Sequence, residues 1–166
     1  MASGDDRAEA LTIDGSDLTV GIISARWNID IVTRLIEGAN RGLLAAGVTN
    51  IEHQTVPGAF ELPLSALLMA ESGKFDALVV LGAVIRGETT HYELVAGECG
   101  RGIMDVQLKT LVPIGMGVLT VEDVAQAEAR SQANGGHNVG EEAAIVAVEL
   151  ALLSQSLPNR SDRTSP

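Results

Sequence analysis

The chain has 166 residues, of which 46% are hydrophobic but only 2% aromatic, so we expect one domain with an aliphatic core. Its formal net charge of −11 at pH 7 argues against nucleic acid as a partner, because the phosphate backbone would repel this surface. A single cysteine, a polar start and the lack of a long apolar run predict a cytoplasmic protein without a disulfide, signal segment or membrane span.

The first half of the chain begins with a polar, turn-rich segment, 1–16, which we expect to form an N-terminal arm. Segment 18–24 reads as a first strand. From Ile31, apolar residues recur at helical spacing, and Gly47 is a typical residue after a helix end. Weak alternation over 51–56 indicates a short second strand.

The middle of the chain contains the clearest strand. Pro63 suits the first turn of a helix that continues to Ala70. The unbroken apolar run 77–85 is typical of a strand buried on both faces. Apolar residues then step along a helix of roughly 18 residues, from Tyr92 to beyond Val106.

The last third adds a fourth strand at 113–119, a short helix within 120–130, a loop at 134–140 and a final helix at 141–157. Strand and helix thus alternate four times. This pattern predicts a single α/β domain over 17–157, a three-layer α/β/α sandwich around a four-stranded parallel sheet. The remaining residues, 158–166, are predicted to be disordered.

Standard cofactor and metal signatures do not occur. The sequence has no phosphate-binding G-x-x-x-x-G-K-[ST], no G-x-G-x-x-G after the first strand, no G-x-S-x-G and no Cys/His metal spacing. ATP, NAD, zinc and serine-hydrolase chemistry are therefore disfavoured, and we expect no metal.

The loops after the first three strands hold the candidate site residues, because ligands gather at the carboxyl ends of parallel strands. These loops are 25–28, 57–61 and 86–91. Two of the four aromatic residues, Trp27 and Phe60, lie in them. They could stack on a flat ligand, or they could plug the ends of the core with about equal plausibility.

Other polar residues support more than one interpretation. The backbone N–H groups from Gly87 onward could bind an anion at a helix N-terminus, although capping by a threonine is the simpler explanation. His91 could transfer protons or be structural. Arg130 could bind a phosphate or pair with its own helix, and Glu61 could bind hydroxyl groups or be a solvated surface residue.

Four motifs occur together in a specific order. They are A-R-W-N at 25–28, V-P-G-A-F-E-L-P at 56–63, L-G-A-V-I-R-G-E-T-T-H-Y-E at 81–93 and G-V-L-T-x-E-D-x-x-Q-A-x-x-R at 117–130. From about residue 17 to 155 the chain resembles the lumazine synthase family, which has a flavodoxin-like fold. The resemblance implies a transferase of riboflavin biosynthesis. Its reaction condenses 5-amino-6-(D-ribitylamino)uracil with 3,4-dihydroxy-2-butanone 4-phosphate to give 6,7-dimethyl-8-ribityllumazine, phosphate and water, without a cofactor.

The resemblance also implies roles for individual residues. His91 would transfer protons and Arg130 would bind the phosphate beside backbone donors at Glu88 and Thr89. The remaining substrate-binding residues would contact the pyrimidine or its ribityl chain: Trp27, Asn28, Gly58, Ala59, Phe60, Glu61, Ala83, Val84, Ile85 and Met116. The family builds each site between subunits of a pentamer, so Met116 and Arg130 would come from a neighbouring copy.

Three departures from the family pattern leave alternatives open. Val139 stands where many relatives have lysine, and His137 could replace that cation. Met116 stands where many have an aromatic residue. The length of the 131–140 loop favours a pentamer or decamer over a sixty-subunit shell. A non-catalytic flavin- or lumazine-binding relative, or a structural shell protein, are the alternative functions.

Overall fold

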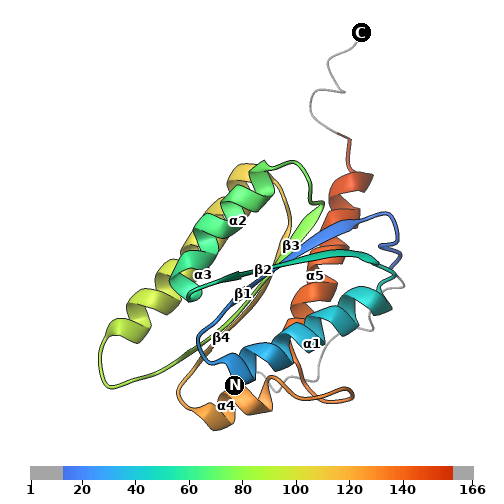
Figure 1. Cartoon of the computed structure of the whole chain (residues 1–166). Helices are drawn as coiled ribbons and strands as arrows, with labels where there is room; N and C mark the ends of the chain where they lie inside the picture. Colours follow the sequence, from blue (N-terminus) through green and yellow to red (C-terminus); the bar gives the residue numbers. More distant parts are fainter. Residues whose placement is uncertain (1–12, 159–166) are drawn as a thin grey trace.

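The computed structural model of the protein describes residues 13–158 and shows one parallel sheet with helices on both faces (Figure 1). The strand order is β2-β1-β3-β4. The strands are β1 (Thr19–Ala25), β2 (Asn50–Val56), β3 (Ala77–Ile85) and β4 (Ile114–Val121). The helices are α1 (Ile29–Ala45), η1 (Ala59–Glu61, a 3₁₀ turn), α2 (Leu62–Glu71), α3 (His91–Thr110), α4 (Val124–Ala129) and α5 (Val139–Ser156). This confirms the predicted α/β/α sandwich, whose four strands and five longer helices occur in the expected order.

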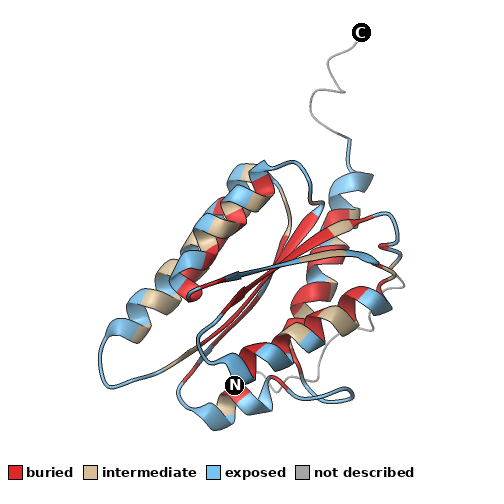
Figure 2. Ribbon diagram, in the orientation of Figure 1, coloured by how far each residue is buried: buried red, intermediate tan, exposed pale blue. Residues whose placement is uncertain are grey.

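Two apolar clusters hold the layers together. Ile22 of β1 packs in the cluster under α1 and α5, whereas its neighbour Ile23 packs in the cluster under α2 and α3. Strand β3 is buried from Ala77 to Ala83, as its unbroken apolar run predicted. In Figure 2 the central strands and the inner sides of the helices are buried. A parallel sheet covered on both faces explains why apolar residues are continuous along its strands.

Several boundaries differ from the prediction because side chains cap the helices. Helix α4 starts at Val124, not at 120, since β4 continues to Val121 and the Asp123 carboxylate accepts from the N–H of Gln126 (2.8 Å). Helix α5 starts two residues earlier than predicted because Asn138 caps it. The predicted arm lies mostly outside the described residues, but Ile13 packs against the α1/α5 cluster. The predicted tail lies outside them apart from residue 158.

None of the helices within residues 13–158 combines the length and the apolar character that crossing a membrane requires.

Candidate active site

A cleft of about 680 Å³ opens where β1, β2 and β3 end. The carboxyl ends of parallel strands meet at one edge of a sheet, so the three following loops come together there. The predicted site residues that line this cleft are Trp27, Asn28, Gly58, Ala59, Phe60, Glu61, Ala83, Val84, Ile85, Thr89 and His91. The topology thus brings together most of the residues that the sequence indicated.

The loop after β1 presents Trp27 to solvent. The side chain is 73% exposed, which is inconsistent with a plug at the end of the core. The next residue, Asn28, has a left-handed backbone (φ 55°), a conformation that asparagine tolerates better than most residues. Its Nδ2 donates to the carbonyl of Ala83 (2.8 Å), which ties this loop to the end of β3.

The loop after β2 passes close beside Trp27. A Cβ atom at Gly58 would lie 3.2 Å from Cδ1 of Trp27 and 3.1 Å from Oε2 of Glu61, so a larger residue would press on both. Phe60 follows on the η1 turn and is 54% exposed. Both aromatic side chains are therefore free to contact a ligand rather than buried in the core.

The loop after β3 leads directly into α3. His91 is the first residue of that helix, is exposed, and its backbone N–H contacts Oγ1 of Thr89 (3.4 Å). Thr90 occupies the cap position without a side-chain hydrogen bond. The imidazole of His91 accordingly reaches the cleft from a fixed helix end.

Arg86, in the same loop, is held by two carboxylates. Its Nε donates to Oε2 of Glu122 (2.6 Å), its Nη1 bonds to Glu93, and its guanidinium lies 4.2 Å from the centre of the Tyr92 ring. The hydrogen bonds that Arg86 donates to Glu93 and Glu122 raise the pKa of Arg86 above its usual value, and the same contact lowers the pKa of Glu93. The charge of Arg86 is therefore balanced beside the cleft.

Gly87, from the candidate loop 86–91, also lines the cleft, together with three residues that the sequence did not assign to a site: Tyr92, Leu94 and Val95. Tyr92 and Val95 were interpreted only as part of a helical apolar face. Because residues three and four apart share one side of a helix, His91 itself points to Leu94 and Val95. A helix that begins at His91 would have predicted that Leu94 and Val95 also face the cleft.

Three predicted residues do not line the cleft of this chain: Glu88, Met116 and Arg130. Met116 lies on the edge strand β4 and is 38% exposed. Arg130 is exposed at the end of α4, where its Nη1 donates to the carbonyl of Gln126 (3.1 Å). His137 was the candidate to replace the lysine that many relatives have at position 139, and its Nε2 lies 3.2 Å from Oε1 of Glu142.

No group of three or more His, Cys, Asp or Glu side chains within residues 13–158 is arranged to hold a metal ion. The cleft instead offers exposed aromatic faces, backbone groups at the end of β3 and one histidine. These groups suit stacking, hydrogen bonding and proton transfer to a planar, polar ligand.

Residues 17–155 match the sequence model of the family described as 6,7-dimethyl-8-ribityllumazine synthase. Three curated relatives carry the same name. The protein of Deinococcus deserti is 46% identical over 86% of this chain and 92% of its own length. Those of Paracidovorax citrulli and Deinococcus radiodurans are 45% and 44% identical, over 93% and 91% of this chain and 98% and 97% of their own lengths.

Proposed function

The chain belongs to the 6,7-dimethyl-8-ribityllumazine synthase family, and we propose that it catalyses the formation of 6,7-dimethyl-8-ribityllumazine in riboflavin biosynthesis. The substrates are 5-amino-6-(D-ribitylamino)uracil and 3,4-dihydroxy-2-butanone 4-phosphate. The observation that carries this proposal is the single cleft in which the loops after β1, β2 and β3 bring aromatic side chains and His91 together.

The cleft offers distinct surfaces for the parts of the pyrimidine substrate. We place the ring on Trp27, whose exposed indole is available for stacking. Residues 83–85, at the end of β3, meet the edge of the uracil partly through their backbone, and residues 59–61 hold the ribityl chain. A volume of about 680 Å³ is in the range of small-molecule sites.

His91 transfers the protons in this scheme. The 5-amino group attacks the butanone carbonyl to form an imine with loss of water, phosphate leaves, and the second amine closes the ring with loss of another water. Each step moves protons between nitrogen, carbon and oxygen, which a positioned imidazole can mediate near neutral pH. Holding two substrates in one cleft supplies the rest of the acceleration through orientation.

We infer that the site is completed by a second copy of the chain. The phosphate needs a cation, but Arg86 beside the cleft is balanced by Glu93 and Glu122. Arg130 lies outside the cleft and has no carboxylate within ion-pair distance among residues 13–158. A neighbouring copy that presents Arg130 and Met116 would supply the missing contacts.

The outer surface of α2 and α3 supports such an assembly. It exposes large apolar side chains that a monomer would leave in water: Leu64, Leu68, Met104 and Leu108. Because the cleft and Arg130 lie on different surfaces of the chain, the contact between copies is head-to-tail, a kind of contact that forms a closed ring when the rotation between copies closes. We propose a pentamer, or an assembly of pentamers, that works in the cytoplasm.

The activity is tested by mixing the purified protein with both substrates and following lumazine absorbance. We expect product only when both substrates are present. No product under conditions where a characterised synthase is active would overturn the proposed activity. Tight binding of riboflavin or a lumazine without condensation would identify the chain as a non-catalytic relative instead.

The shared site is tested by mixing two impaired variants and measuring the rate with the butanone phosphate well below its wild-type KM. If His91 and Arg130 of one site come from different copies, then co-assembled His91→Ala and Arg130→Ala subunits form some sites with both residues intact. Equal mixing should restore about a quarter of the wild-type rate, because each of the two positions is intact in half of the sites. No recovery after verified co-assembly would place both residues in one copy.

A further inference from the structure

The backbone of Arg130, the proposed phosphate ligand, is held by the N-terminal end of α5. The N–H of Val139 donates to the Arg130 carbonyl (2.9 Å), and Ser131 pairs with Asn138 in an antiparallel bridge. The N–H of Gln132 donates to the His137 carbonyl (2.9 Å). Residues 131–138 thus form a closed loop, with Arg130 at its base.

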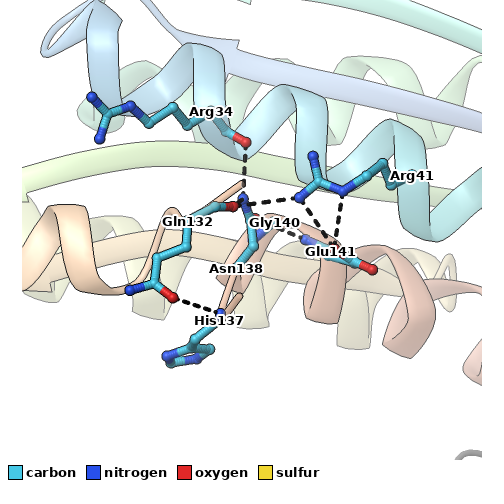
Figure 3. Close-up of polar contacts among 7 residues, drawn as sticks. All are labelled: Arg34, Arg41, Gln132, His137, Asn138, Gly140 and Glu141. Atoms are coloured by element: carbon cyan, nitrogen blue, oxygen red, sulfur yellow. Dashed lines mark hydrogen bonds and ion pairs between the residues drawn. The ribbon is translucent and has the colours of Figure 1, made fainter. Parts of the chain in front are cut away.

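Asn138 connects this loop to two helices (Figure 3). Its Nδ2 donates to the carbonyls of Gln132 (2.9 Å) in the loop and Arg34 (3.0 Å) on α1. Its Oδ1 accepts from the N–H groups of Gly140 (2.9 Å) and Glu141 (3.2 Å) at the start of α5. The side chain is 2% exposed and uses both of its N–H donors, so water cannot easily replace these bonds.

The surrounding backbone leaves room for this amide and little else. A Cβ atom at Gly38 of α1 would clash with the Asn138 amide, and one at Gly140 would clash with the Leu35 carbonyl. Arg41 adds a longer contact to the Gln132 carbonyl (3.5 Å) and an ion pair with Glu141 (3.2 Å). The position of the loop is therefore set by its contacts with α1.

We propose that Asn138 is the positioning residue for Arg130. It touches neither substrate; it holds the base of the 131–138 loop so that the guanidinium stands where the phosphate of the neighbouring site binds. This inference rests on the proposed function, and it assigns a role in phosphate recognition to a buried neutral side chain. Removing the amide donors should displace Arg130, and an ångström-scale displacement of its guanidinium is enough to weaken phosphate binding.

The test uses Asn138→Asp in the complete, assembled enzyme. The aspartate keeps the acceptor for Gly140 and Glu141 but sets oxygen against the carbonyls of Arg34 and Gln132. We expect the KM for the butanone phosphate to rise about tenfold, while the KM for the ribitylaminouracil stays within about twofold of wild type. Asn138→Ser, which keeps an acceptor for the start of α5 but replaces the two amide N–H donors with a single shorter hydroxyl, is used instead if the aspartate variant does not fold.

A double-mutant cycle shows whether Asn138 acts through Arg130. In an Arg130→Ala background, Asn138→Asp should raise the KM for the butanone phosphate no further. Val48→Ala, a truncation at a buried position, is the control for lost stability and should leave both KM values unchanged.

Three results would overturn the role of Asn138. They are an unchanged KM in Asn138→Asp, the same rise in both Arg130 backgrounds, or a rise in both KM values that Val48→Ala reproduces. The wild-type protein in the same assay reports separately on the proposed function. No lumazine from the wild type would overturn that function, whereas product with unchanged variant KM values would overturn only the positioning role.

Discussion

The loop after β3 carries Arg86, the loop after α4 begins at Arg130, and the structure holds these two arginines in opposite ways. Arg86 is enclosed by Glu93 and Glu122 and lies over Tyr92. Arg130 donates only to a backbone carbonyl of its own helix and has no carboxylate partner among the described residues. Nearness to a cleft therefore does not identify the anion-binding cation. Of these two arginines, the one without a carboxylate partner is Arg130, which supports the proposal that Arg130 binds the phosphate.

The two loops also differ in what fixes them. Exposed ion pairs hold the β3 loop, and they titrate with pH and weaken with salt. The buried amide of Asn138 holds the 131–138 loop, and an amide does not titrate. The first loop should be the more sensitive to solution conditions, although it carries the histidine.

The largest effect should come from the β3 loop. We expect His91→Ala to lower kcat about 100-fold or more, because general acid–base transfer is lost, with little change in the KM for the butanone phosphate. His53→Gln is the matched control, since His53 bonds Ser24 away from the cleft (2.7 Å). Steady-state kinetics measures both constants. A kcat for His91→Ala equal to that of His53→Gln would remove His91 from the reaction.

Replacing Arg130 should have the second-largest effect. Arg130→Ala should raise the KM for the butanone phosphate about 10- to 100-fold, since a charge-assisted hydrogen bond to phosphate is lost. Arg130→Lys should recover part of this because it keeps the charge without the forked geometry. The KM for the ribitylaminouracil serves as the internal reference. An equal rise in both KM values would argue against a phosphate contact.

The balanced arginine should matter less for binding. Arg86→Leu should leave the KM for the butanone phosphate near that of wild type and lower the Tm, because it removes two ion pairs and the contact with Tyr92. Thermal unfolding and kinetics on the same preparation separate the two effects. If Arg86→Leu raised the KM for the butanone phosphate as much as Arg130→Ala does, the two arginines would not differ in phosphate binding.

The smallest effect should be a pH dependence of the β3 loop. Arg86 lowers the pKa of Glu93, so the pair contributes stability above the unfolded-state pKa of Glu93, and the contribution is lost as pH falls through the folded-state value. The Tm difference between wild type and Glu93→Gln should therefore shrink below about pH 4.5. A difference that stays constant down to about pH 3 would contradict this origin.

Much of the fold followed from local patterns. The run 77–85 predicted a buried strand because both of its faces pack against helices, and parallel pairing then brought the three polar loops to one edge. The exposure of Trp27 could not be read from its position, since an aromatic residue at a strand end suits a plug or a ligand equally. Only the packing around the loop decides between them.

The remaining features depend on partners that are distant in the sequence. The sequence could not show that Arg86 is balanced, because one of its carboxylates, Glu122, follows a different strand. It predicted α5 two residues too late because Asn138, the cap, also bonds to α1. The cap hydrogen bonds to Gly140 and Glu141 are local, but the bonds that fix the Asn138 side chain reach α1 and the 131–138 loop.

Gly38 and Asn138 depend on each other although they lie far apart in the chain. A side chain at position 38 would displace the amide, and a smaller residue at 138 would leave a space that a side chain at 38 could fill. During divergence, neither position should therefore change alone without cost. Alanine at position 38 should be tolerated only in relatives that have a smaller residue at position 138. Positions 38 and 138 are therefore expected to covary among relatives.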